Sequence, residues 1–160
     1  MISVSEIIIR LSLASFFGAL IGLERERKHW AAGLRTHMLV CVGSCLMMIV
    51  SAFGFSDIIG TPDITLDPSR IAAQVVTGIG FIGAGAILFS NNKTIRGLTT
   101  AAGIWTVAGI GLATGGGMYL AAAVATAIAI IILWGLQPLE KMYFEKFKQK
   151  SLRITTSHDF

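Results

Sequence analysis

Charged residues are scarce in this sequence, and acidic residues are absent from the interior of its long apolar runs. Only 14% of the 160 residues are charged, 54% are apolar, and the mean hydropathy is +0.73. A water-soluble domain of this length needs more polar surface than this composition offers. The composition therefore excludes a soluble enzyme, and the lack of acids at mid-depth argues against a proton-driven pump of the familiar kind.

Residue patterns typical of catalytic and metal sites are also lacking. The sequence contains no CxxC or HExxH motif and no Ser/His/Asp series, and its cysteines, Cys41 and Cys45, both lie in one apolar run. Their spacing puts them on one helical face, so they are predicted to be small buried residues rather than a disulfide or metal site. His37 has no second histidine at ligand spacing and is predicted to be a hydrogen-bonded structural residue. We predict no enzymatic activity and no cofactor.

Apolar stretches long enough to cross a membrane make up most of the chain. A membrane-spanning helix needs about 20 such residues, and spans are predicted at residues 7–23, 38–55, 71–89, 98–113 and 118–136. The predicted fold class is an all-α membrane protein, with a transmembrane domain over residues 1–137. Residues 138–160 are predicted to form a cytoplasmic tail, either a helix along the membrane surface or a solvated segment, or the start of a further domain.

Basic residues are concentrated in alternate loops. Eleven of the thirteen lysines and arginines fall in the loops at 24–37 and 90–97 and in the tail, leaving only Arg10 and Arg70 on the other side. The positive-inside rule then predicts an outside N-terminus and a cytoplasmic C-terminus in a plasma membrane. No basic flank precedes the first span, so it is predicted to be a retained helix rather than a removed signal peptide. This placement explains the net charge of +4 without a nucleic-acid partner.

The first two predicted spans resemble the next two. Arg10 and Gly18 have the same separation as Arg70 and Gly78, and the second and fourth spans begin with Gly-Leu-Arg-Thr and Gly-Leu-Thr-Thr. This pattern favours a parallel repeat of two helical hairpins followed by a fifth helix. Chance likeness between two glycine-rich hairpins is the alternative.

Glycines recur at short spacing inside two spans. The run from Gly78 to Gly85 contains a GxGxxG string, but no strand precedes it, so a nucleotide-binding loop is excluded. Such glycines allow a neighbouring helix to approach closely, and the alternative is that they line a narrow substrate path. We predict the packing role for Gly18, Gly22, Gly78, Gly80, Gly83 and Gly85.

Arg10 and Arg70 lie near the predicted outer boundary, and each has an acid one turn earlier, Glu6 and Asp67. A local ion pair or contact with lipid headgroups explains both arginines. The alternative is a gate over an outer vestibule formed by the loop acids Asp57, Asp63 and Asp67. Because carboxylates are the ligands that Mg²⁺ prefers, Asp67 is the candidate metal ligand.

A charged network is predicted at the opposite, inner face. Thr36 and Thr99 or Thr100 are predicted to be the N-caps of the second and fourth spans. The network beside them is predicted to comprise Glu24, Arg25, Arg35, His37 and Arg96, with Glu26 close to the helix starts. It either fixes the loop geometry or provides a docking or ion site.

These residues resemble the MgtC/SapB family of bacterial inner-membrane proteins. The matching stretches are 18–26, 33–37, 67–74, 78–87 and 96–102, with Trp105. The resemblance implies a plasma-membrane protein tied to growth at low Mg²⁺ and, in pathogens, to survival inside phagocytes. It marks as important Glu24, Arg25, Arg35, Thr36, His37, Asp67, Arg70, Gln74, Arg96 and Thr99. Many relatives continue into a cytosolic domain resembling the ACT fold, so this sequence is expected to be either a piece of a longer protein or a short member.

Two functions are consistent with these features. The first is a non-enzymatic accessory protein of Mg²⁺ homeostasis that binds or regulates membrane partners. The second is a Mg²⁺ transporter or permeation protein, which needs a homo-oligomer because five helices are few for a pore. The predicted partners are the lipid bilayer, further copies of the chain and a membrane protein, with Mg²⁺ as a ligand or transported ion.

Overall fold

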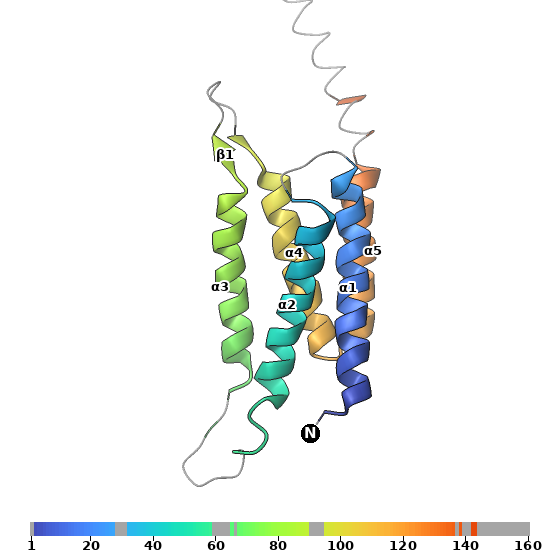
Figure 1. Cartoon of the computed structure of the whole chain (residues 1–160). Helices are drawn as coiled ribbons and strands as arrows, with labels where there is room; N and C mark the ends of the chain where they lie inside the picture. Colours follow the sequence, from blue (N-terminus) through green and yellow to red (C-terminus); the bar gives the residue numbers. More distant parts are fainter. Residues whose placement is uncertain are drawn as a thin grey trace, which may run out of the picture.

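The computed structural model describes residues 2–27, 32–58, 65, 67–89, 95–136, 138 and 142–143. Its helices are α1 (Val4–Glu26), α2 (Leu34–Phe53), α3 (Ser69–Gly85), α4 (Leu98–Gly115) and α5 (Tyr119–Ile130), and α5 continues into a π-helix, η1 (Ile131–Gly135). Two short strands, β1 (Leu88–Phe89) and β2 (Ile95–Arg96), pair antiparallel between α3 and α4. The predicted all-α class with five helices is confirmed (Figure 1).

The strand pair corrects the third predicted span. That span was placed at 71–89, but α3 ends at Gly85, and Leu88 then pairs with Arg96 across the β1–β2 ladder. A short apolar run has no periodicity that separates a helical turn from a two-residue strand, so the sequence pattern extended the helix too far. The π-helical turn at the end of α5 was not predicted either.

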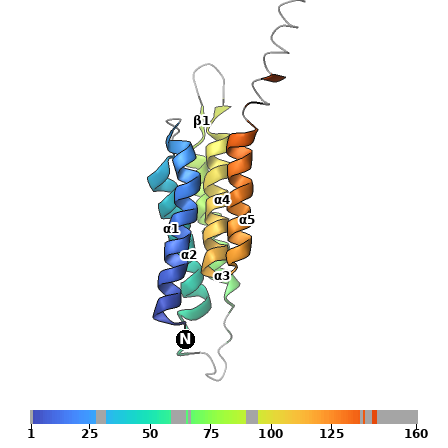
Figure 2. The ribbon, with the colours of Figure 1, turned by 90° about the vertical axis from the view of Figure 1, so that its right-hand side faces the viewer.

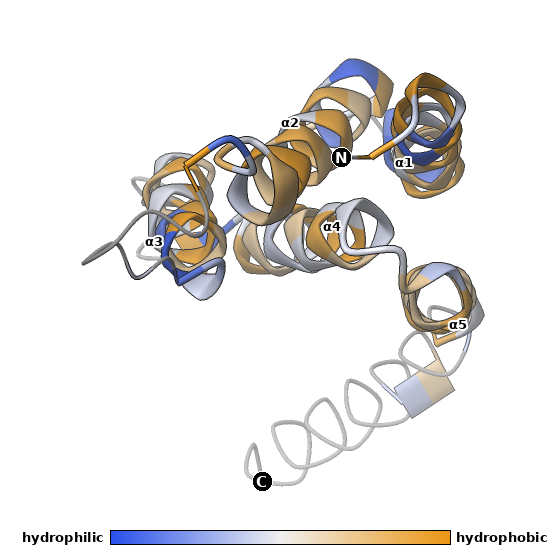
Figure 3. Cartoon of the chain, turned by 90° about the horizontal axis from the view of Figure 1, so that it is seen from below, coloured by the Kyte–Doolittle hydropathy of each residue, from blue (hydrophilic) through white to orange (hydrophobic). Residues whose placement is uncertain are grey.

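Three of the helices, α1, α2 and α4, are long and apolar enough to cross a membrane, while α5 with η1 forms a shorter apolar helix. Apolar residues lie on the outward sides of the helices as well as between them (Figure 3), and Leu39, Phe81 and Leu120 are among the most exposed. Helices that are apolar all round suit lipid surroundings rather than water. The chain is therefore a membrane protein, and spanning by α3 and α5 stays a prediction.

Helices α2 and α4 form the centre of the bundle. Helix α1 packs on α2, α3 packs on α4 and α2, and α5 lies at the edge against α4 and α1 (Figure 3). Successive helices run in opposite directions, so the end of α1, the β1–β2 pair and the end of η1 lie at one end of the bundle (Figures 1 and 2). We call this the Arg25 end, and the end at which α1 begins the Arg10 end.

The Arg25 end is the end that the charge distribution predicts to be cytoplasmic. The hairpins α1–α2 and α3–α4 run in the same sense, but the orientation in a membrane and an origin by duplication both stay predictions. The predicted surface helix of the tail lies almost wholly outside the described residues.

Small side chains fill the interface between the central helices. Cys41 and Cys45 are fully buried and not disulfide-bonded, as predicted, and they lie in a core with Ile21 and Val107. Because such side chains are short, the helix axes approach closely. Dispersion contacts then stabilise the interface, since the hydrophobic effect does not drive helix association within a bilayer.

Glycines set the closest helix contacts. A Cβ atom on Gly18 would lie 2.8 Å from the His37 carbonyl oxygen, and one on Gly22 would lie 2.7 Å from the Leu34 Cα atom. The tightest contacts between the backbones of two packed helices come from a pair that the sequence analysis did not single out, Gly111 and Gly115 of α4. A Cβ on these would meet α2 backbone oxygens at 2.3 Å and 2.4 Å.

The glycines of α3 behave differently from those of α1 and α4. Gly83 is buried, and a Cβ there would lie 3.6 Å from the Ala101 side chain. A Cβ on Gly78, Gly80 or Gly85 would meet nothing within 4 Å among the residues that the structure describes. Within the described part of one chain these three glycines therefore pack against no other helix, which differs from the predicted close contact.

Candidate functional site

Arg25 is the centre of a buried polar cluster between the ends of three helices. It lies in the last turn of α1 and is only 2% exposed. Its Nη2 donates a hydrogen bond of 3.0 Å to Oγ1 of Thr100, which is fully buried in the first turn of α4. Its Nη1 lies 3.9 Å from Oε2 of Glu24. Arg25 thus joins α1 to α4, and an adjacent carboxylate offsets its charge.

His37 brings α2 to the same cluster. Its side chain is fully buried, and Nδ1 lies 2.8 Å from the carbonyl oxygen of Gly33. Because a carbonyl only accepts, we assign the proton to Nδ1, which leaves Nε2 as an acceptor. Among the described residues Nε2 has no hydrogen-bond partner, and the bare backbone of Gly103 on α4 lies opposite it. The predicted structural hydrogen bond of His37 is present, and Nε2 has no partner among the described residues.

Glu26 holds the start of α2. The backbone N–H of Leu34 donates 2.9 Å to Oε2 of Glu26, and the N-cap residue is Gly33. A Cβ on Gly33 would lie 1.7 Å from that carboxylate oxygen, so a larger residue there would have to displace the Glu26 side chain from this contact. A carboxylate at a helix N-terminus is also favoured by the helix dipole.

The threonines do not have the predicted capping role. The N-cap of α2 is Gly33 and that of α4 is Gly97, whose left-handed backbone has φ 94°. Thr36, Thr99 and Thr100 lie inside the first helical turns, where Thr100 accepts from Arg25 instead of capping. The cap prediction was wrong because a Gly-Leu-x-Thr start places the cap on the glycine, where the chain makes its turn.

The predicted network also includes two arginines that do not join the buried cluster. Arg35, in the first turn of α2, and Arg96, on β2, are both exposed. Among the described residues neither makes an ion pair or hydrogen bond with Glu24, Arg25 or His37. The structure therefore divides the predicted network into a buried cluster of Glu24, Arg25, His37 and Thr100 and an exposed basic surface of Arg35 and Arg96.

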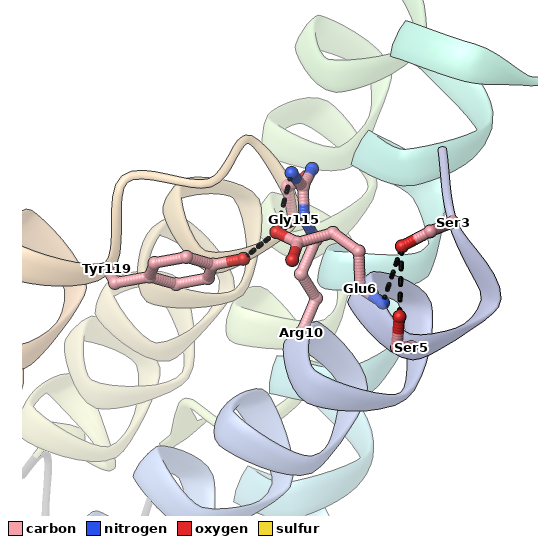
Figure 4. A network of polar contacts seen from close by, with 6 residues as sticks. All are labelled: Ser3, Ser5, Glu6, Arg10, Gly115 and Tyr119. Atoms are coloured by element: carbon pink, nitrogen blue, oxygen red, sulfur yellow. Dashed lines mark hydrogen bonds and ion pairs between the residues drawn. The ribbon is translucent and has the colours of Figure 1, made fainter. Parts of the chain in front are cut away.

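A second polar cluster lies at the Arg10 end (Figure 4). Arg10 is 9% exposed; its Nε donates 3.0 Å to Oε1 of Glu6, and its Nη1 donates 2.6 Å to the carbonyl oxygen of Gly115. The Tyr119 hydroxyl donates to the same Glu6 oxygen, and the Arg10 guanidinium lies 5.3 Å from the Phe53 ring centre. This cluster ties α1 to the turn between α4 and α5.

The pair of Glu6 and Arg10 follows from their spacing of one helical turn. The contacts with Gly115 and Tyr119 do not, since these residues lie more than 100 positions away in sequence. The available signal was a tyrosine directly after the turn that joins α4 to α5 at the Arg10 end.

Asp67 begins α3 rather than pairing with an arginine. Its Oδ1 accepts from the backbone N–H of Ser69 at 2.9 Å and from the Ser69 hydroxyl at 2.6 Å. These hydrogen bonds stabilise the carboxylate and lower the pKa of Asp67 below its usual range. Among the described residues Arg70 makes no ion pair with Asp67, so the predicted local pair is corrected to a helix-start contact.

The other predicted outer residues form no cluster with Asp67. Arg70 and Gln74 are exposed and line a shallow hollow on α3. Asp57 is exposed, and Asp63 lies outside the described residues. Among the residues that the structure describes, no group of three His, Cys, Asp or Glu side chains is close enough to hold a metal ion. A metal-binding role for Asp67 stays a prediction.

Comparison with known proteins gives one family. The sequence pattern described as the MgtC family matches residues 11–142. The "Putative magnesium transporter YhiD" of Escherichia coli K12 is 52% identical over 81% of this chain and 60% of its own length. Protein SapB of Bacillus subtilis is 41% identical over 95% of this chain and 66% of its own length. Protein MgtC of Brucella abortus is 39% identical over 93% and 59%. The chain thus spans about 60% of the length of such relatives, and no solved structure matches it.

Proposed function

The chain belongs to the MgtC family, and we propose from this that it is a non-enzymatic plasma-membrane protein of Mg²⁺ homeostasis that acts by binding a membrane partner. The observation that carries the proposal is the construction of the Arg25 end. There the buried cluster fixes the first turns of α2 and α4, while Arg35 and Arg96 remain exposed beside them.

The electrostatics of this end suit an acidic partner. Each helix N-terminus carries roughly half a positive charge, and the Glu26 carboxylate offsets the one on α2. The two exposed arginines add two full charges at the same end, so the surface attracts anionic groups. An acidic segment of another membrane protein has the chemistry that such a surface binds.

The distribution of acids supports a binding role over ion permeation by one chain. In the described helices Glu6 lies in the first turn of α1, and Glu24 and Glu26 lie in its last turn. The buried charged side chains of the described helices are cationic, Arg10 toward the start of α1 and Arg25 in its last turn. A buried arginine repels a divalent cation, so a path for Mg²⁺ through these sites is unfavourable.

Transport of Mg²⁺ is the second candidate, and the name of the relative YhiD, a "Putative magnesium transporter", favours it. It requires several copies, and the uncovered glycines of α3, Gly78 and Gly80, offer a face on which a second copy can approach closely. A cysteine at Gly80 tests this assembly. Cross-linking of two copies in the membrane would support the homo-oligomer, and its absence at native abundance would count against it.

Growth at low Mg²⁺ tests the binding role. The full chain would be expressed in a bacterial strain lacking its own family member. Arg35→Ala and Arg96→Ala are expected to abolish the growth advantage at unchanged membrane abundance, because both side chains are exposed and neither makes a hydrogen bond or ion pair with another described residue. Arg70→Ala is the comparison, since it removes an exposed arginine from the opposite end, and a loss of growth in this variant alone would move the site of action to that end. If both variants grew like the parent, the basic surface would not be the site of action.

A further inference from the structure

A groove between α1 and the end of α5 has a polarity gradient along its length. It has a volume of about 480 Å³ and is lined by Leu20, Leu23, Glu24, Arg27, Ile130 and Trp134. On the α1 side the lining residues recur every three or four positions, which places them on one helical face. They change from leucine to glutamate to arginine toward the Arg25 end.

The opposite wall changes in the same direction. Helices α1 and α5 both run toward the Arg25 end (Figure 2), so Ile130 precedes Trp134 as Leu20 precedes Arg27. Trp134 is 66% exposed, and tryptophan is favoured at the membrane–water boundary. The groove therefore passes from an apolar section to a charged section bordered by tryptophan, which matches the order of acyl chain and headgroup in a phospholipid.

The charged section presents both signs at a defined spacing. Glu24 lies in the last turn of α1 and Arg27, three residues on, is its C-cap with a helical backbone; the Cβ atoms of such a pair are about 5–6 Å apart. A phosphoethanolamine headgroup carries a phosphate and an ammonium group at a comparable separation. The guanidinium of Arg27 matches the phosphate, and the carboxylate of Glu24 matches the ammonium group, which has three N–H donors.

The ion pair of Glu24 with Arg25 is compatible with this second contact. Oε2 of Glu24 faces Arg25 at 3.9 Å, and a carboxylate offers about four lone-pair sites on its two oxygens. A purely anionic headgroup carries no ammonium group of its own to bind Glu24, so this carboxylate would face only the lipid's negative charge. A choline headgroup has no N–H to donate.

We propose that this groove, which we call the α1–α5 groove, binds a phosphatidylethanolamine molecule, with its phosphate on Arg27, its ammonium group on Glu24 and an acyl chain along Leu20, Leu23 and Ile130. The lining does not include Arg35 or Arg96 of the basic surface. Its occupation does not depend on the proposed role in Mg²⁺ homeostasis.

Native mass spectrometry of the purified full chain tests the proposal. The probes are phosphatidylethanolamine, its N-monomethyl and N,N-dimethyl derivatives, phosphatidylcholine and phosphatidylglycerol, all with the same acyl chains. Affinity is expected to fall stepwise with methylation and to be about tenfold weaker for choline than for ethanolamine, the loss that goes with a charge-assisted hydrogen bond. Equal binding of all headgroups, or strongest binding of phosphatidylglycerol, would overturn the proposal.

Two variants assign the headgroup contacts. Glu24→Gln is expected to remove the preference for ethanolamine over choline, and Arg27→Gln to weaken both, since both lipids carry the phosphate. The matched controls are Glu26→Gln and Arg35→Gln, which make the same charge changes at the same end on residues outside the groove lining. Controls with the same effect as their partners would also overturn the assignment. If Glu24→Gln does not fold, the methylation series on the parent chain still decides.

Discussion

Arg25 and Arg10 are buried cations at opposite ends of the bundle, and each is held by partners of two kinds. Arg25 has a neighbouring carboxylate and the Thr100 hydroxyl, while Arg10 has the Glu6 carboxylate and the Gly115 carbonyl. Burying a charge costs free energy unless it is paired and hydrogen-bonded. The Thr100 hydroxyl and the Gly115 carbonyl, both from α4, therefore lower the free-energy cost of burying the two arginines.

Replacing Thr100 tests this account of Arg25. Thr100→Val keeps the shape but removes the acceptor, so a buried charged donor loses its hydrogen bond at a cost of about 1–3 kcal/mol. Thr99→Val, on an exposed neighbour, is expected to change stability by less than about 0.5 kcal/mol. Thermal unfolding in detergent would measure both. Equal stability of the two variants would show that the Arg25–Thr100 bond contributes nothing measurable.

Asp67 makes the start of α3 sensitive to acid. Its pKa is lowered in the folded chain by the Ser69 hydrogen bonds, so the stabilisation is fully present above the usual pKa of aspartate. It is lost as the pH falls through the lowered folded-state value. The protection of the amides in the first turn of α3, measured as hydrogen exchange relative to the intrinsic rate at each pH, is therefore expected to fall at acid pH in the parent chain. Asp67→Asn keeps the acceptor and should remove this pH dependence; a loss of protection at acid pH that persists in it would assign the effect to another group.

At the scale of the helices, the contact of α4 with α2 depends on two glycines of α4, Gly111 and Gly115, which have no side chain to separate the backbones. A Cβ on Gly111 or Gly115 would lie 2.3 Å or 2.4 Å from α2 backbone oxygens, far inside any tolerated distance, and backbone cannot move aside as a flexible side chain can. Alanine at either position should push the helices apart and cost several kcal/mol or block assembly.

Gly109→Ala is the control for this contact, because a Cβ there meets nothing within 4 Å among the described residues. It is expected to leave abundance and unfolding temperature unchanged or slightly raised, since alanine favours helix more than glycine does. Full abundance of Gly111→Ala in the membrane would refute the close α2–α4 contact.

The sequence predicts the helices better than it predicts their contacts. Long apolar runs locate all five helices, because a bilayer leaves few alternatives to helix for a spanning segment. Which glycines pack is decided by the rotation of each helix about its axis, and this depends on the whole bundle. Gly18 therefore meets α2 while Gly80 does not meet another helix of the chain, although both were predicted to pack.

In the candidate sites too, contacts between residues close in sequence were predicted, whereas contacts between distant residues were not. The pair of Glu6 and Arg10 follows from their spacing, whereas the Arg25–Thr100 bond joins residues 75 positions apart and required the fold. The exclusion of Arg35 and Arg96 from the buried cluster also required the structure. A count of nearby charges does not say which side chains point inward.

At the scale of the whole molecule, the antiparallel order of the helices makes a definite topology prediction. Asp57→Cys, at the Arg10 end, is expected to react only with reagent added outside the cell, and Arg96→Cys only after permeabilisation. The native cysteines are fully buried and give little background. Labelling of both introduced cysteines from the same side would contradict the alternation of the helices across the membrane.

Flux of Mg²⁺ into liposomes tests the central claim most directly, because a binding protein and a transporter differ in it without ambiguity. The purified full chain would be reconstituted around a Mg²⁺-sensitive dye, beside empty vesicles and vesicles containing an Asp67→Ala variant. The account predicts dye signals equal to those of empty vesicles at every protein density, since the described helices carry no acid between their first and last turns and their buried charges, Arg10 and Arg25, are cationic. Flux above empty vesicles that rises with protein density and is lost in Asp67→Ala would contradict it and establish the chain as a Mg²⁺ transporter.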